Sequence, residues 1–360
     1  MLLLAGLNGR VVADRSAIYN RRCEYSETCK VDCCFNATSG IGMTAEPVSP
    51  RPEPSTPAVA LAFAAVYIIW GSTYLAIRIA VQTLPPFTMA GTRFAVAGAV
   101  MYAWFRGRSG RPTPRHWCSA TIVGGLMLLG GNGAVVWAET MVHSGIAALL
   151  VAIVPMWLVV LSALRPTGTR PNWFDVLGLL IGFAGVYVLV APSTGAAETA
   201  IKPLGAGLLL FASFSWACGS LYSRTAELPR NQGMATAIEM LAGGALLLIV
   251  GAATGEWSGI DPREFSAKSL LALLYLIAFG SIVAFSAYMW LLQVSTPAKV
   301  GTYAYVNPIV AVFLGWLILS EPFGRTTLIA TTLILCGVVL ITALGRRRRR
   351  RVGATVESSD

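Results

Sequence analysis

The stretch AVALAFAAVYIIWGSTYLAIRIA, residues 58–80, carries a single charged side chain, Arg78, in a run of apolar, aromatic and small residues. A helix that crosses the hydrocarbon core of a bilayer needs about 20 mainly apolar residues. This stretch is long enough, and Arg78 stands near its end, where a long side chain reaches the headgroup region. The stretch therefore predicts a membrane-spanning helix.

The composition of the whole chain indicates the same environment. Hydrophobic residues make up 55% of the 360 residues and charged residues 12%, with a mean hydropathy of +0.66. A soluble domain has about a quarter of its residues charged, and intrinsic disorder needs low hydrophobicity with high charge. Composition therefore excludes disorder and predicts an all-α integral membrane protein with many spans.

The same length criterion predicts ten transmembrane helices along the chain. The connections between them are short, and many contain Pro, Gly, Ser or Thr. The predicted helices lie at 58–80, 86–105, 118–138, 145–164, 174–192, 204–223, 233–252, 269–292, 299–319 and 326–344.

The Lys and Arg residues outside the spans predict how the chain crosses the membrane. Counted from Arg51 onward, one set of alternate connections, together with the two ends and with Lys299 at the start of a span, holds sixteen of them, and the other set holds four. Cytoplasmic segments are enriched in Lys and Arg, so both termini are expected in the cytoplasm and the protein in the cytoplasmic (inner) membrane. The run Arg346–Arg351, in the basic tail 345–360, is read as a topology anchor that contacts lipid headgroups rather than nucleic acid.

Short motifs of the first half of the chain recur in the second half at an offset of about 150 residues, which predicts an internal duplication. Residues 58–192 would form one repeat and residues 204–344 the other, each with five helices. The matches, in the same order in both halves, include Gly71-Ser-Thr-Tyr74 with Gly219-Ser-Leu-Tyr222, Pro155 with Pro308, and Gly185-Val186 with Gly337-Val338.

An odd number of helices in each repeat makes the second copy enter the membrane from the opposite side. Inverted repeats of this kind are typical of secondary transporters, whose substrate site lies near the midplane where the repeats meet. The sequence therefore predicts two inverted repeats around a central cavity, with alternating access to its two sides.

The first 56 residues are polar, end in a Pro-rich stretch and belong to neither repeat. Their four cysteines follow no ligand spacing typical of a metal site, and we expect no metal and no other cofactor. Met43 begins a short polar leader before the first span. We therefore hypothesise that residues 1–42 are a mis-called extension, which peptides from before Met43 in the native protein would contradict.

Aromatic and amide side chains within the spans predict a substrate cavity. Asn132 and Asn307 are uncharged polar residues well inside their predicted spans, at a depth where a substrate site is expected. Trp70 and Trp216 lie mid-helix, away from the interfacial aromatic belts. Pro155 and Pro308 have no backbone N–H group, so each leaves a carbonyl group near midplane without its helical partner. The alternative is that both prolines serve only as packing kinks. The predicted lining is Trp70, Tyr74, Asn132, Pro155, Trp216, Tyr222, Tyr288, Tyr303, Tyr305, Asn307 and Pro308.

Arg93 and Glu239 are the charged residues predicted deepest in the spans. At 1.5 Å per residue they lie about 10 Å and about 9 Å from opposite faces, so an ion pair between them is disfavoured. A carboxyl group surrounded by apolar groups holds its proton more tightly. Glu239 is thus the candidate for proton coupling, with a structural hydrogen bond as the alternative. Glu139 and Glu321 are interpreted as boundary residues at helix ends.

Five short motifs stand at intervals along the spans: Tyr67-Ile-Ile-Trp-Gly-Ser-Thr-Tyr74, Gly131-Asn-Gly133, Trp216 with Gly219-Ser220, Glu239-Met-Leu and Tyr305-Val-Asn-Pro308. Together they resemble the EamA-type family of the drug/metabolite transporter superfamily, in particular its bacterial inner-membrane branch of drug or amino-acid metabolite exporters. The resemblance covers residues 58–344 and implies ten helices in two inverted repeats, export of small molecules and no prosthetic group. In that family the first, third, fourth, sixth, eighth and ninth helices line the cavity.

The leading prediction is therefore a secondary transporter that exports amino acids, related metabolites or hydrophobic drugs, with membrane lipids around it. An intramembrane enzyme is disfavoured because no H-E-x-x-H motif exists and both histidines, His116 and His143, fall in predicted loops. A non-transporting sensor or lipid-handling protein stays open, since a fold does not fix a function. Gly178-x-x-x-Gly182 permits close helix packing, either within the chain or in a homodimer.

Overall fold

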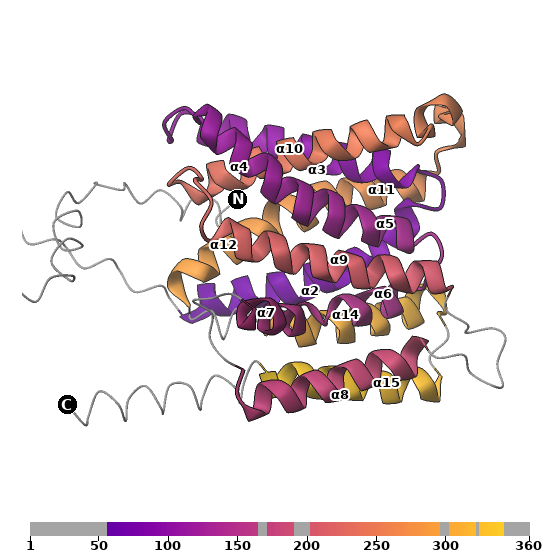
Figure 1. Cartoon of the computed structure of the whole chain (residues 1–360). Helices are drawn as coiled ribbons and strands as arrows, with labels where there is room; N and C mark the ends of the chain where they lie inside the picture. The colour runs from indigo at the N-terminus through magenta and orange to yellow at the C-terminus, as the bar shows by residue number, and fades with distance from the viewer. Residues whose placement is uncertain (1–55, 165–170, 191–201, 296–301, 322–323, 342–360) are drawn as a thin grey trace, which may run out of the picture. The chain divides into compact units, whose positions relative to one another are not determined.

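A computed structural model describes residues 56–164, 171–190, 202–295, 302–321 and 324–341. Within these residues the secondary structure is helical, with no β-strand (Figure 1). The predicted N-terminal extension with its cysteines and the predicted basic tail lie outside the described residues.

The helices of the first half occupy all five of its predicted ranges within the described part of the chain. The third range is continuous but changes to a π-helix midway, and the fourth is broken near its middle. The elements are α2 (Thr56–Ala80), α3 (Pro86–Phe105), α4 (Pro114–Gly124), the π-helix η2 (Gly125–Gly133), α5 (Ala134–Ala138), α6 (Ser144–Val151), α7 (Val154–Ala163) and α8 (Trp173–Val190).

The second half repeats this order, with two short 3₁₀ helices added in one connection. Its third helix also changes to a π-helix midway. The elements are α9 (Pro203–Ser223), α10 (Gln232–Ala253), η4 (Glu256–Gly259), η5 (Pro262–Glu264), α11 (Ala267–Tyr275), the π-helix η6 (Leu276–Val283), α12 (Ala284–Val294), α14 (Tyr303–Leu319) and α15 (Arg325–Val339).

Among the described residues, seven helical segments are long and apolar enough to cross a membrane. The helices α14 and α15 contain apolar stretches that are shorter, and α3 is not among the seven. The chain is therefore a helical membrane protein, whereas ten crossings remain a prediction. The seven segments are Thr56–Ala80, Pro114–Ala138, Ser144–Ala163, Trp173–Val190, Pro203–Ser223, Gln232–Ala253 and Ala267–Tyr288.

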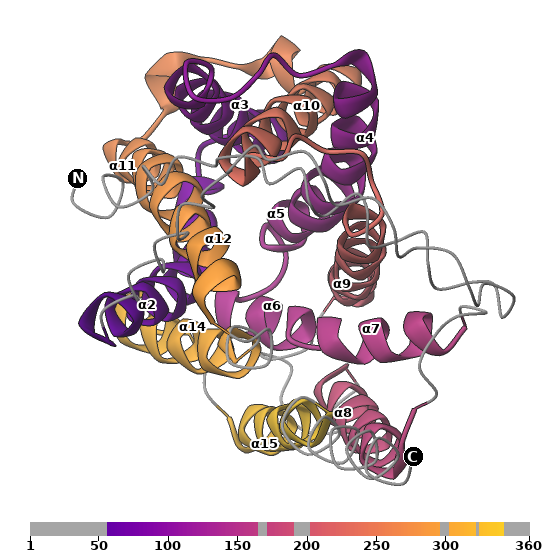
Figure 2. The ribbon, with the colours of Figure 1, turned by 90° about the vertical axis from the view of Figure 1, so that its left-hand side faces the viewer.

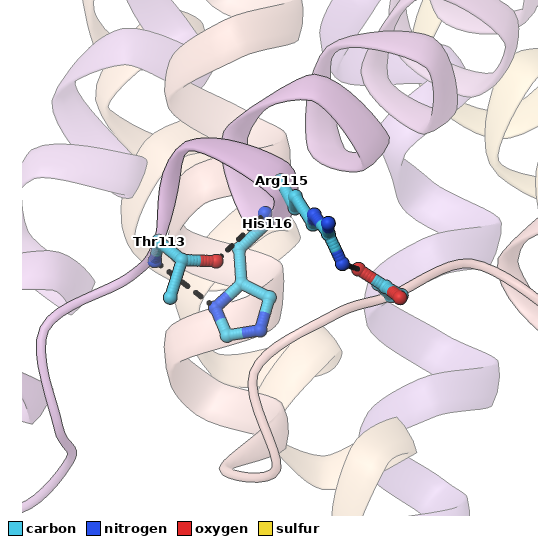
Figure 3. Close-up of polar contacts among 4 residues, drawn as sticks. Thr113, Arg115 and His116 are labelled. Atoms are coloured by element: carbon cyan, nitrogen blue, oxygen red, sulfur yellow. Dashed lines mark hydrogen bonds and ion pairs between the residues drawn. The ribbon is translucent and has the colours of Figure 1, made fainter.

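Helix starts follow local sequence signals. Proline stands in the first turn of α3, α4, α7 and α9, where its missing N–H group is not needed. Thr113 caps α4 by accepting from the His116 backbone N–H (3.3 Å), and its own N–H donates to His116 Nδ1 (3.2 Å; Figure 3). Next to this cap, Arg115 and Glu227 approach to 3.9 Å but are largely exposed, so their ion pair adds little stability.

Equivalent helices of the two halves pack against each other. The pair α3 and α10 and the pair α8 and α15 make extensive contact, and Figures 1 and 2 show α8 beside α15. Glycines bring α8 and α15 close, because a Cβ atom at Gly337 would stand 2.6 Å from the Gly178 carbonyl oxygen and 2.8 Å from Gly182 Cα. The Gly178-x-x-x-Gly182 motif thus packs within the chain.

The two π-helices are the fold's clearest internal match, since η2 and η6 start 151 residues apart (125 and 276). Each accepts a side-chain hydrogen bond from the first helix of the other half. Ser215 Oγ on α9 donates to the Leu126 carbonyl in η2 (2.6 Å), and Trp70 Nε1 on α2 donates to the Gly280 carbonyl in η6 (3.2 Å). Sequence reasoning predicted the offset but not the π-helices.

Candidate functional site

A cavity lies where the two halves meet, among α2, η2, α5, α6, α7, α9, α12 and α14. It holds about 820 Å³ of space not filled by atoms, its open mouth included. Its described lining is aromatic, aliphatic and amide, with one hydroxyl side chain at Thr73 and no charged side chain. The predicted residues that the structure brings together there are Trp70, Tyr74, Asn132, Pro155, Trp216, Tyr303, Asn307 and Pro308.

Trp70 is the best-anchored aromatic side chain of this wall. Besides its hydrogen bond to Gly280, its ring centroid lies 5.2 Å from that of Phe285, 5.3 Å from that of Tyr303 and 5.0 Å from that of Tyr288. Edge-to-face and tilted contacts of this kind hold aromatic rings in place. The cavity thus has a rigid aromatic face rather than a loose one.

The two asparagines of the cavity differ in their bonding. With its amide oriented so that the nitrogen faces the two carbonyl groups, Asn307 donates to the carbonyl oxygens of Tyr303 (3.2 Å) and Tyr67 (3.3 Å), and the second of these bonds ties α14 to α2. Asn132 is half-buried, and its amide has no hydrogen-bond partner among the described residues. The Asn132 amide is therefore unpaired within the described structure, whereas the Asn307 amide contributes to helix packing.

Both prolines line the cavity but act differently on their helices. Ala152 and Ile153 interrupt the fourth span, and Pro155 follows in the first turn of α7. Pro308 instead stays inside a continuous α14. A proline leaves the carbonyl four residues earlier without its helical donor. The residues in question, Val151 and Ala304, also line the cavity.

Three predicted lining residues do not contribute to the described wall. Tyr222 is half-buried on α9, and Tyr288 lies behind the wall, packed on Trp70 and Tyr303. The side chain of Tyr305 lies outside the described structure. For Tyr222 and Tyr288, depth in the sequence was a fair guide to burial but did not tell which face of the helix each side chain occupies.

The two deep charged residues lie away from the cavity wall. Arg93 is 3% exposed, and its Nε donates to Ser281 Oγ in η6 (2.9 Å). Glu239 is half-buried on α10, and no ion pair joins it to Arg93 in the described structure. Sequence reasoning placed neither in the wall, and their roles remain predictions.

Buried carboxyl groups were missed by the sequence analysis. Glu139 is 0% exposed and Glu321 8% exposed, although both follow the ends of spans, where boundary residues were expected. The Glu321 carboxylate accepts from Ser144 N–H (2.9 Å), Ser144 Oγ (2.9 Å) and Gly145 N–H (3.2 Å) at the start of α6. The available signal was a carboxyl group within two residues of the end of an apolar run, with no Lys or Arg within three residues of it.

Comparison with known proteins places the chain in a family. The model of the EamA-like transporter family matches residues 57–191 and residues 203–343, which together cover most of the chain. These two matches coincide with the two halves that repeat each other in the structure.

Two relatives are similar to the chain in sequence, and one solved structure is similar to it in fold. The chain is 42% identical over 280 residues to the uncharacterized inner membrane transporter YedA of Escherichia coli strain K12, covering 77% of this chain and 88% of that protein. It is 22% identical over 294 residues to the uncharacterized transporter YoaV of Bacillus subtilis strain 168, covering 81% and 99%. A solved structure shares the fold with a TM-score of 0.57 at 23% identity, over 81% of this chain and 99% of that one. The chain therefore belongs to the EamA-like transporter family.

Proposed function

We propose that the protein is a secondary transporter that exports small metabolites, such as amino acids and related compounds, or hydrophobic drugs. The observation that carries this proposal is the uncharged, aromatic cavity to which both repeats contribute. Aromatic rings bind apolar groups and organic cations, and the free amide of Asn132 offers a donor and an acceptor. Phosphate recognition relies on Arg or Lys side chains, and the described wall has none.

We further propose the topology that such transport requires. The helices α3, α14 and α15 would complete ten crossings of the cytoplasmic membrane, with both termini in the cytoplasm and inverted repeats that alternate access to the cavity. This proposal is supported by the packing of α3 on α10 and of α8 on α15, and by the matched π-helices. Inverted repeats of this kind rock against each other around a fixed site.

The experiment that tests the export proposal compares compounds released by cells. Cells that overproduce the protein and cells with an empty vector are grown with a panel of amino acids, related metabolites and hydrophobic drugs, and the medium and cytoplasm are profiled. Export predicts compounds that accumulate in the medium only with the protein. Cytoplasmic accumulation would indicate import instead. No difference for any compound would contradict transport and favour a sensor or lipid-handling protein.

A further inference from the structure

A charged cluster lies one helical turn beyond the cavity wall on three helices. Along α2, Arg78 follows the lining residue Tyr74 by four residues; along the third span, Glu139 follows Val135 by four, and its backbone N–H donates to the Val135 carbonyl (2.9 Å). Four residues of helix rise about 6 Å. We define the Glu139 cluster as Arg78, Glu139, Ser144 and Glu321; Ser144 precedes the lining residue Ala148 of α6 by four residues.

Hydrogen-bond donors in the Glu139 cluster are distributed unevenly. Glu321 takes three donors at the start of α6, where the helix dipole also favours a negative charge. The Arg78 guanidinium donates to the backbone carbonyl of Glu139. The two side-chain oxygens of Glu139 are fully buried and have no hydrogen-bond partner among the described residues. The hydrogen bonds therefore stabilise Glu321 as a carboxylate, whereas the described residues offer no such donor to the carboxyl group of Glu139.

The charged and titratable groups around Glu139 come from several elements. Tyr74 and Arg78 face it from α2, Arg93 from α3, and Glu321 from the segment after α14. Burial and the nearby Glu321 carboxylate raise the pKa of Glu139 well above its ordinary value, and Arg78 and Arg93 only partly oppose this. When two carboxyl groups share a buried region, the one with fewer donors keeps the proton.

We propose that Glu139 is the proton-binding site of this transporter, holding a proton while the Glu139 cluster is closed and releasing it to water when the cluster opens. In that step the carboxyl O–H bond breaks, the proton passes to a water molecule, and the carboxylate stays near Arg78 and Arg93. Tyr74 both lines the cavity and lies near Glu139. A substrate bound in the cavity and the proton on Glu139 would therefore both be next to the Tyr74 side chain. The coupling part of this proposal rests on the proposed transport function.

The protonation of Glu139 is tested without any substrate. Infrared difference spectra of the full-length protein in lipid nanodiscs, recorded between neutral and alkaline pH, report the carbonyl stretch of protonated carboxyl groups. We expect Glu139→Gln to lose a component of this band that Glu264→Gln, an exposed carboxyl on η5, retains. A Glu139→Gln spectrum equal to that of the wild type overturns the proposal. If this variant does not fold, Glu139→Asp must shift the pH at which the component titrates, and no shift overturns the proposal.

The coupling is tested with a compound found by the release experiment, in vesicles that contain the purified protein. We expect the wild type and Glu264→Gln to respond to a pH gradient, and Glu139→Gln to transport without responding. If Glu139→Gln keeps the response and Glu239→Gln loses it, the proton site is Glu239 and our proposal fails. Transport by the wild type with no pH response also overturns coupling but leaves the proposed function intact. Absence of any transport refutes the proposed function. In that case the infrared spectra alone decide whether Glu139 binds a proton.

Discussion

At the scale of single residues, several side chains chosen for their depth in a span line one cavity. The contacts made by residues in the connections between spans were not predictable. Trp70 and Trp216 were predicted from their mid-helix positions, and both line the cavity. The burial of Glu139 was not predicted, because the groups around it, such as Arg78 and Glu321, come from distant parts of the sequence. Side chains that meet across about 180 residues of sequence, such as Ser144 and Glu321, leave no local pattern.

The two cavity asparagines give a prediction at this scale. Replacing Asn132 by Ala should lower flux at subsaturating substrate about three- to tenfold, the effect of about one hydrogen bond, with the unfolding temperature unchanged. Replacing Asn307 by Ala should also lower the unfolding temperature, because it removes the link between α14 and α2. Flux assays and thermal unfolding of both purified variants check this. Equal unfolding temperatures for the two variants would contradict the different roles assigned to them.

At the scale of helices, apolar length predicted the ranges in which the described helices lie, and proline marks the start of several of them. The π-helices η2 and η6 were not predicted, because their apolar, glycine-containing sequences suit an α-helix equally well. Their tertiary partners, Ser215 and Trp70, come from the other half of the chain. π-Helical turns are frequent at functional sites, and η2 carries Asn132 into the cavity wall.

The packing of α8 on α15 gives a prediction at the scale of helices. Gly337→Val should lower the unfolding temperature, because its side chain would collide with the backbone of Gly178 and Gly182, and overpacking costs about 1–3 kcal/mol. The matched control is Gly207→Val on α9, where nothing lies within 4 Å of an added Cβ atom. Thermal unfolding of both variants in one detergent measures the difference. Equal unfolding temperatures for them would show that this contact is not tight.

At the scale of the whole molecule, the duplication was predictable because the same motifs recur in order at a nearly constant offset. Two matches to the family model and two matched π-helices agree with that offset. The direction in which each helix crosses the membrane rests on the distribution of Lys and Arg, since a contact pattern within the protein does not distinguish the two sides of a bilayer.

That orientation gives a prediction for two exposed glycines in connections. Gly110 lies between α3 and α4 and Gly259 between α10 and α11, each in open space. In a chain whose seven native cysteines are replaced by Ser, Gly259→Cys should react with a membrane-impermeant maleimide in intact cells. Gly110→Cys should react only after the membrane is opened, because five predicted spans separate the two positions. Labelling of both from the same side would contradict the inverted repeat.

We propose above all that solute crosses the membrane through the cavity where the two repeats meet. The most direct test measures counterflow of a released compound into vesicles that contain wild type, Trp216→Ala or Trp104→Ala at equal protein density. Trp216 lines the cavity, whereas Trp104 is 47% exposed near the end of α3 and serves as the matched control. We predict that Trp216→Ala lowers counterflow about tenfold and that Trp104→Ala leaves it unchanged. Equal counterflow in all three proteins would contradict the claim.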